Sequence, residues 1–405
     1  MRTPFTPSLM QGFPPEAPDQ IRFDDLARLQ YPGHRWVYSH WRELVPTATV
    51  WRGDGPITGL PSAPQDLERF EFADPAGGRC TLDRALEISA TDGLLVMHDG
   101  KVLYERYFGH LSAQLPHRCF SVTKSFVGLL AGMLIHEGLL ARDTRVVSLI
   151  PELRDSGWSD AIVQQVLDMT LNLTFDEDYA NGEGDVVRSR LAAGTLPRPA
   201  AYSGPRSIYE YLPTIAAAGP HHGGFEYITP NTQVLSWLVQ RASGKSLPTL
   251  LSERIWQRIG AQQDGYFAVD PTGIADAGGG LCVTLRDLAR FGELIRNHGR
   301  IGNDQIISAQ VLEQIARGSD REAFRHAGYA MFEGWSYHDQ WWISHDVHGA
   351  IRGLGVYGQQ LYVAPRAGLV IARFGSQPIA VDERVEKLLL SAWDALAHQL
   401  TRKGP

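Results

Sequence analysis

The sequence predicts an α/β (α+β) fold in which one sheet carries a helical insert. Two strand-like runs lie within residues 93–108, and two more lie near the C-terminus, at 358–365 and 367–375. Between them, from about 150 to 265, the sequence shows short helical patterns and loops without strand alternation. Strands on both sides of a helical middle indicate one sheet that is built from N- and C-terminal parts of the chain.

Composition places the chain among globular proteins. Its 405 residues are 43% apolar and 20% charged, which is enough to bury one large core or two smaller ones. The net charge of -7 is modest and both signs are interspersed, which argues against a nucleic-acid partner. The three cysteines are scattered without CxxC spacing, so neither a disulfide scaffold nor a zinc module is indicated, and a reducing compartment suits them.

The N-terminal 70 residues read as an irregular, proline-bearing arm with one short helix over 24–29. No basic start followed by an apolar run is present, and no stretch approaches 18 uninterrupted apolar residues. We therefore expect a cytoplasmic protein without a membrane partner. The predicted domains are the arm at 1–70, a discontinuous α/β domain at 71–150 and 266–405, and a helical insert at 151–265.

Local signals define the main elements. In GLLVMHDGKVLYERYF (93–108), Asp-Gly between two strand-like runs predicts a β-hairpin. Residues 121–136 carry apolar side chains on all sides, which predicts a fully buried helix that Gly138 ends. The C-terminal runs predict two strands, and residues 381–400 then predict an amphipathic closing helix.

The buried helix contains one lysine near its start. Lys124 is the only Asp, Glu, Lys or Arg between Arg118 and Glu137, and Ser121 precedes it by three residues. On a helix this Ser-x-x-Lys spacing puts both side chains on one face. Burial and the nearby helix N-terminus lower the proton affinity of such an amine, so it can serve as a base for the hydroxyl.

The motif alone carries little information, because about one chance match is expected in a chain of this length. The simpler alternative is that Ser121 caps the helix while Lys124 extends to solvent. The apolar continuation of the helix favours the catalytic interpretation, since a surface helix would show a polar face.

A wider set of motifs resembles a known superfamily. Tyr227 lies in FEYITPNTQVLSWLVQRASGKSL, about a hundred residues after the serine, and IWQRIGAQQDGYFAVDPTG, GGGLCVTLRDLARFGELIRNHG and GLGVYGQQLYVAP follow in order. Over residues 90–400 the chain resembles the class C β-lactamase and penicillin-binding serine hydrolases. It is most similar to the 6-aminohexanoate-dimer (nylon-oligomer) hydrolase and esterase branch. The resemblance implies an antiparallel sheet flanked by helices, with an all-helical insert domain.

The resemblance also implies roles for particular residues. Ser121 becomes the nucleophile, Lys124 its base, and Tyr227 the group that relays a proton to the leaving group. The oxyanion hole combines the backbone N–H of Ser121 with that of Val356, from an edge strand. Tyr179 matches a loop tyrosine that covers the substrate.

Two departures from the superfamily bear on the substrate. Thr229 stands where a Tyr-x-Asn motif has asparagine, and no Lys-Ser/Thr-Gly triplet occurs near residues 353–355. A carboxylate on the substrate would need another cation, for which Arg352 is the candidate. Among the nearby tryptophans, Trp342 is the one we expect to line an apolar cleft. Because the Lys-Ser/Thr-Gly triplet and the asparagine are missing, efficient β-lactamase activity is not expected.

Other functions remain open at this point. A metal hydrolase is disfavoured because there is no HExxH motif, although His221-His222 and His345-x-x-His348 occur. A Gly-x-Ser-x-Gly elbow is absent, which disfavours an α/β-hydrolase. A β-lactamase or DD-peptidase and a non-catalytic ligand-binding protein are the remaining alternatives. The sequence predicts a small-molecule substrate, amide or ester, with no metal or other cofactor, and leaves a homodimer open.

Overall fold

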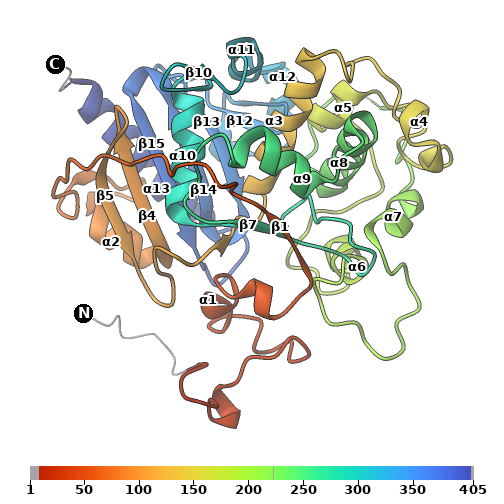
Figure 1. The fold of residues 1–405 in the computed structure, drawn as a ribbon, viewed down its shortest axis with the longest axis horizontal. Coiled ribbons are helices and arrows are strands. Elements are labelled where there is room, and N and C mark those ends of the chain that lie inside the picture. Colours follow the sequence, from red (N-terminus) through yellow and green to blue (C-terminus); the bar gives the residue numbers. More distant parts are fainter. Residues whose placement is uncertain (1–8, 222, 403–405) are drawn as a thin grey trace.

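A seven-stranded antiparallel sheet forms the centre of the computed structural model, which describes residues 9–221 and 223–402. Its strand order is β11-β12-β13-β14-β15-β4-β5. The strands are β4 (Thr91–His98), β5 (Lys101–Tyr107), β11 (Ser336–His338), β12 (Trp341–Ile343), β13 (Ile351–Gly355), β14 (Gln359–Ala364) and β15 (Leu369–Gly375). The pairing of β15 with β4 joins the two ends of the chain, as Figure 1 shows where orange strands lie beside blue ones. The predicted single sheet is thereby confirmed.

The predicted hairpin is β4 followed by β5. His98 pairs with Lys101, so Asp99 and Gly100 form a two-residue loop. Both loop residues have positive φ, 46° and 76°, as a primed turn requires. Asp-Gly supplies this conformation at little cost, because glycine has no Cβ and aspartate tolerates the left-handed region.

Both faces of the sheet are covered, which explains the unbroken apolar run in β4. Leu95 and Met97 face the core that contains α3 (Val122–His136) and α10 (Leu285–Arg296). Leu94 and Val96 face the core that contains α2 (Leu82–Ile88) and α13 (Glu383–Arg402). Alternate residues of the strand therefore enter two different hydrophobic layers. The predicted closing helix is α13.

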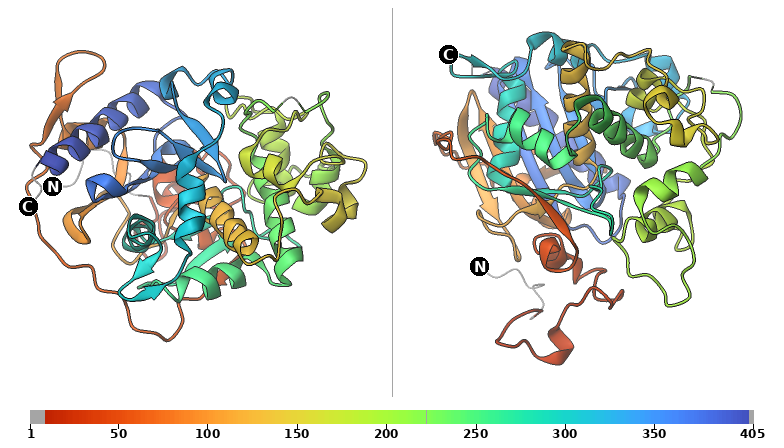
Figure 2. Two further views of the ribbon diagram at one scale, coloured as in Figure 1. Left: turned by 90° about the horizontal axis from the view of Figure 1, so that it is seen from above. Right: turned by 45° about the vertical axis from the view of Figure 1, so that its right-hand side comes forward.

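Six helices, all short except α8, follow α3 along the chain and gather on one side of the sheet, where Figure 2 shows them in yellow and green. They are α4 (Val146–Leu149), α5 (Val163–Asp168), α6 (Asp185–Ala192), α7 (Ile208–Tyr211), α8 (Thr229–Ser243) and α9 (Leu247–Leu251). The α3 helix packs against α8, and one hydrophobic cluster runs from the sheet into these helices. The domain boundaries at 70, 150 and 265 stay predictions.

The N-terminal segment differs from its prediction. Residues 24–29 form turns, so the helix predicted there is wrong; Pro32 follows too closely for a helix to continue. The first α-helix is α1 (His34–Val37), and a short 3-10 helix at Ala17–Asp19 precedes it. Further on, β1 (Thr47–Val50) was not predicted, because its four residues give too short an alternation. It pairs with β7 (Gly265–Ala268).

The small sheet around β1 has the order β1-β7-β8-β6, where β6 is His117–Arg118 and β8 is Leu281–Val283. The remaining elements are β2 (Glu71–Ala73), β3 (Arg79–Thr81), β9 (Arg300–Ile301), β10 (Asp304–Gln305), α11 (Ala309–Arg317) and α12 (Arg321–Arg325). Among the helices of the described residues, none combines the length and the apolar character needed to cross a bilayer. Because β6 ends three residues before Ser121, this small sheet helps to fix the start of α3.

Candidate active site

Ser121 and Lys124 lie together at the start of α3. Lys124 is 1% exposed, and its Nζ lies 2.9 Å from Ser121 Oγ and 2.8 Å from the carbonyl oxygen of Gly278. Ser121 occupies the N-cap position, but its side chain makes no capping hydrogen bond. The alternative in which Ser121 caps the helix and Lys124 reaches solvent is therefore wrong.

The environment of Lys124 favours its neutral form. Burial lowers the pKa of this lysine from 10.5 to about 8, while the charges of Glu177 and Asp276 act in the opposite direction. At pH 8 about half of the amine is then unprotonated and can accept a proton from a hydroxyl at hydrogen-bond distance.

Tyr227 lies against the same pair, just before α8. Lys124 Nζ sits 5.0 Å from the centre of the Tyr227 ring, and Tyr227 shares a hydrogen bond with Ser121. Burial and the charge of Glu177 raise the pKa of Tyr227 well above its usual range, and the hydrogen bond opposes this shift. Tyr227 therefore stays a neutral phenol, which can donate one proton and accept another.

Two backbone amides lie in the lining shared by the site, that of Ser121 at the start of α3 and that of Val356 after β13. Gly355 ends β13, and a Cβ at this position would lie 2.9 Å from the carbonyl oxygen of Cys119 and 3.1 Å from the nitrogen of Ser121. Glycine thus allows the strand to approach the serine. In residues 9–221 and 223–402, neither the Ser121 nor the Val356 amide donates to a turn, loop or side-chain acceptor. A backbone amide without such an acceptor can bind an oxyanion.

The sequence analysis placed Val356 at an edge strand, but β13, which approaches Ser121, is not at the edge of the sheet. β13 lies inside the sheet, but it pairs with β12 only at Ile351 and Arg352. The last three residues of β13 extend beyond β12 and run along α3. The free edge is therefore local, and it ends at Val356.

Glu177 is a site residue that the sequence analysis missed. It accepts hydrogen bonds from the Tyr179 hydroxyl (2.6 Å), the Thr229 amide (2.7 Å) and the Thr229 hydroxyl. This carboxylate thus ties the loop of Tyr179 to the first turn of α8. Thr229 lines a cavity beside Ser121, and its hydroxyl donates to Glu177. The acidic stretch FDEDY has no spacing signal that would have singled out Glu177.

Two adjoining cavities meet at Ser121, Glu177, Tyr179 and Val356. The larger one, about 290 Å³, is called the aromatic arm and is lined further by Tyr227, Tyr329, Met331, Phe332, Trp342 and Leu354. The smaller one, about 70 Å³, is called the arginine arm and is lined further by Arg118, Arg190, Asp276 and Tyr357. The nucleophile therefore lies between a mainly aromatic compartment, whose wall also contains Gln359 and Glu386, and a compartment with two guanidinium groups.

Trp342 is placed where it was predicted, in the wall of the aromatic arm. Its ring stacks on Tyr227, with ring centres 5.5 Å apart. Trp341, the next residue of β12, points to the opposite side and is fully buried near Phe291. The alternation of β12 thus sends one tryptophan to the cavity and one to the core.

Arg352 does not reach either arm. Its guanidinium is buried between the rings of Trp335 (4.8 Å) and Tyr362 (4.5 Å), and Asp346 lies 3.9 Å away. The prediction that Arg352 replaces the missing lysine is wrong in this geometry, because the side chain packs between aromatic rings instead. The cations that line the cavity are Arg118 and Arg190.

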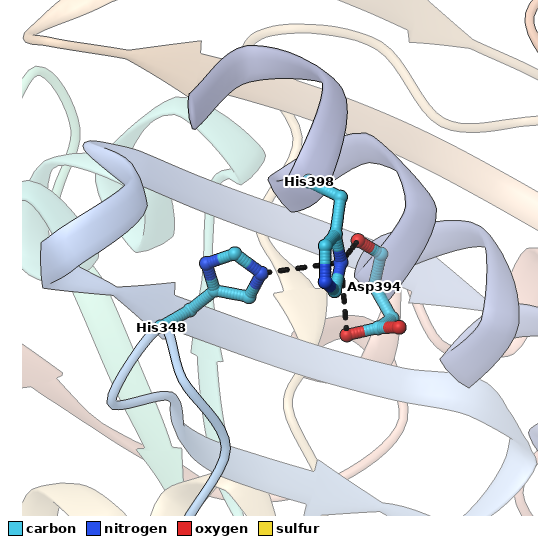
Figure 3. A group of neighbouring side chains, drawn as sticks. All are labelled: His348, Asp394 and His398. Atoms are coloured by element: carbon cyan, nitrogen blue, oxygen red, sulfur yellow. Dashed lines mark hydrogen bonds and ion pairs between the residues drawn. The ribbon is translucent and has the colours of Figure 1, made fainter. Parts of the chain in front are cut away.

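The histidines that were considered as metal ligands take separate partners. His345 Nε2 lies 2.8 Å from Ser336 Oγ, whereas His348 Nε2 lies 3.2 Å from His398 Nδ1. Figure 3 shows His348 beside His398 and Asp394 of α13. This group does not line the two arms, and His222 lies outside the described residues.

Comparisons with known proteins bear on the family of the chain. The family model described as Beta-lactamase matches residues 81–390. The 6-aminohexanoate-dimer hydrolase of Paenarthrobacter ureafaciens is 33% identical over 348 residues, which are 86% of each chain.

Solved structures show the same fold. A Bacillus anthracis protein provisionally named a 6-aminohexanoate-dimer hydrolase superposes with a TM-score of 0.86 at 32% identity, over 93% of this chain and 96% of the other. EstCE1, a hydrolase with promiscuous acyltransferase activity, shares the fold with a TM-score of 0.62 at 16% identity, over 78% of this chain and 96% of the other. The chain is therefore a member of the Beta-lactamase family of hydrolases, on the branch similar to 6-aminohexanoate-dimer hydrolase.

Proposed function

We propose that this protein is a serine hydrolase that cleaves amide or ester bonds of small linear substrates through an acyl-enzyme on Ser121. The observation that carries the proposal is the buried amine of Lys124, with a pKa of about 8, at 2.9 Å from Ser121 Oγ. A buried neutral lysine beside a serine can act as the base that activates the hydroxyl. A purely structural role is a poor explanation, since burying the charged form of a lysine costs stability.

In the proposed reaction, Ser121 Oγ attacks the substrate carbonyl carbon and its proton passes to the neutral amine of Lys124. The carbonyl oxygen becomes an oxyanion, held by the N–H groups of Ser121 and Val356. Tyr227 gives its proton to the departing amine or alcohol and recovers one from the Lys124 ammonium. Water then attacks the acyl ester by the reverse sequence, which releases the acid and restores the serine.

The similarity to 6-aminohexanoate-dimer hydrolase supports a linear amide or a carboxylic ester as the substrate. The aromatic arm supports an apolar group on one side of the scissile bond. A β-lactamase or DD-peptidase is less well supported. The Lys-Ser/Thr-Gly triplet is missing near residues 353–355, and Arg352 is packed away from the cavity.

A substrate panel tests the proposal. Purified protein is incubated with p-nitrophenyl esters, linear amides and a chromogenic cephalosporin, alongside Ser121→Ala and with or without a chelator. We expect turnover of esters or linear amides that is lost in Ser121→Ala and unaffected by the chelator. Binding without any turnover would instead support a ligand-binding protein, and chelator-sensitive turnover would support a metal hydrolase.

A further inference from the structure

Arg190 places an unpartnered guanidinium group in the arginine arm. It lies on α6 (Asp185–Ala192) and lines the cavity that opens at Ser121. In the described part of the chain its side chain has no hydrogen bond or ion pair, although its carbonyl oxygen accepts from Thr195. Arg188, two residues earlier, is ion-paired with Asp185 at 2.5 Å. Arg190 is thus a cation that faces the cavity without an internal counterion.

A second cation stands beside it. Arg118 lines the same arm, stacks over Phe120 at 4.3 Å and donates from Nε to the carbonyl oxygen of Gly279 at 3.0 Å. Burial lowers the pKa of Arg190, and the like charge of Arg118 acts in the same direction. An anion placed between the two guanidinium groups would relieve this repulsion and gain charge-assisted hydrogen bonds.

The two acidic side chains of the arm do not supply that anion. Glu177 accepts three hydrogen bonds from Tyr179 and Thr229. Asp276 accepts from Gln233 Nε2 at 2.8 Å and from the Gly278 amide at 3.1 Å, and its nearest guanidinium, at 3.7 Å, belongs to Arg118. Both carboxylates are therefore occupied by other donors, whereas the Arg190 guanidinium has no acceptor among the described residues.

The position of Tyr227 relates the two arms to the scissile bond. Tyr227 lines the aromatic arm and does not line the arginine arm. As the proposed proton donor to the leaving group, it places that group in the aromatic arm. The acyl portion, on the other side of the carbonyl carbon, then extends into the arginine arm.

We propose that Arg190, assisted by Arg118, binds a carboxylate at the far end of the substrate's acyl chain. The preferred substrates are then half-esters or half-amides of linear dicarboxylic acids with an apolar leaving group. This inference rests on the proposed hydrolase function and names its substrate class. A bidentate guanidinium–carboxylate pair in a partly enclosed arm fixes the chain end and so positions the carbonyl carbon at Ser121.

A charge series tests the inference. Three p-nitrophenyl esters with six-carbon acyl chains differ only at the far end, which is a carboxylate, a methyl or an ammonium group; four- and eight-carbon versions vary the reach. For the wild-type protein we expect kcat/KM to be about ten- to a hundredfold higher for the carboxylate than for the methyl ester of the best chain length. The ammonium ester should be the poorest substrate.

Variants assign the preference to Arg190. In Arg190→Gln the ratio of carboxylate to methyl kcat/KM should fall to near one, mainly through KM. Arg190→Lys should keep part of the ratio, and Arg190→Glu should favour the ammonium ester. Arg188→Gln, on the exposed face of the same helix, is the matched control and should keep the wild-type ratio. Thermal melting of each variant confirms that it is folded.

The possible outcomes separate the two proposals. Turnover of all three esters without a carboxylate preference, or a preference that survives Arg190→Gln in a folded protein, would overturn this inference and leave the hydrolase function standing. No turnover of any ester or of the matching amides would overturn the hydrolase function itself.

Discussion

At the residue scale, the central feature is Lys124, a lysine that is buried away from solvent. Lys124 sits on a helix whose other side chains are mostly apolar, and its hydrogen-bond partners are Ser121 and the Gly278 carbonyl. Burial disfavours the ammonium form, so the same environment that costs stability produces a base near neutral pH.

The activity is expected to rise with pH. Because burial lowers the pKa of Lys124 to about 8, the protonated and inactive form dominates below pH 7 and the neutral base dominates above pH 9. The profile of kcat/KM should show an acidic limb with an apparent pKa near 8, which belongs to the coupled serine, lysine and tyrosine. Stopped-time assays from pH 5.5 to 9.5 measure it.

Lys124→Ala provides the matching control. It should lower kcat/KM by about a thousandfold or more, since base catalysis and serine activation are lost together. A folded Lys124→Ala protein with near-normal turnover would reject the proposed role of the lysine. A flat profile across pH 8 in the wild type would do the same.

Tyr227→Phe should separate amides from esters. The variant keeps the ring that stacks on Trp342 but loses the hydroxyl that shares a hydrogen bond with Ser121. An amine is a poorer leaving group than an alcohol and depends more on protonation. We expect kcat to fall more for amides than for p-nitrophenyl esters, by about tenfold or more. Equal losses on both substrates would count against a proton relay through Tyr227.

At the scale of elements, the site depends on how closely β13 approaches the start of α3. Gly353 and Gly355 lie against this helix, and a Cβ on Gly355 would meet Cys119 and Ser121 backbone atoms. The strand end can supply the Val356 amide to the same oxygen as the Ser121 amide only if this distance is kept.

Gly355→Ala should therefore damage catalysis more than folding. The added Cβ would lie 3.1 Å from the Ser121 nitrogen, which displaces the strand end from the oxyanion position. We expect kcat to fall about a hundredfold, the usual effect of losing one oxyanion donor. Gly59→Ala is the control, because a Cβ there meets nothing within 4 Å. Equal kcat values for the two variants would exclude the proposed oxyanion hole.

The sequence predicted those elements that carry strong local signals. The Asp-Gly turn, the apolar run of α3, the strands β14 and β15, and the period of α13 each determine their own structure. The missed features depend on distant contacts. β1 is only four residues long and is defined by its pairing with β7, which lies more than two hundred residues away.

The candidate site follows the same division. Ser121, Lys124 and Tyr227 were predicted from motifs, and the structure brings them into contact. Glu177 was missed because its importance comes from three hydrogen bonds across the cavity, which no spacing reveals. Arg352 was misplaced because a strand position alone does not tell which rings enclose the side chain.

At the scale of the whole molecule, the residues that line the two arms are widely separated in the sequence, from Arg118 to Glu386. The walls of the cavities come from α6, α8, β12 and β13, and from the loops after Phe175 and before α13. The sheet that carries β13 is completed only when β15 pairs with β4. Substrate choice is therefore a property of the folded whole, and it should reflect both the apolar and the charged arm.

Linear substrates should be preferred strongly over β-lactams. Short esters or small linear amides should exceed any penicillin or cephalosporin by at least about a hundredfold in kcat/KM, or about 2.7 kcal/mol in transition-state binding. The physical reason is that no Lys-Ser/Thr-Gly lysine is available near β13 and Arg352 is enclosed by rings. Steady-state kinetics on nitrocefin-type and p-nitrophenyl substrates measure the ratio. A cephalosporin that matched the best ester would contradict this account.

The most direct test of the central claim is to trap the acyl-enzyme. A fluorophosphonate probe, or a slowly deacylating ester quenched in acid, is followed by intact mass and peptide mapping of the wild type, Ser121→Ala and Ser125→Ala. We predict one adduct, on the peptide that contains Ser121. It should be absent from Ser121→Ala and retained in Ser125→Ala, because Ser125 is buried and donates a hydrogen bond to the Gln340 carbonyl. An adduct that persists in Ser121→Ala would contradict the account.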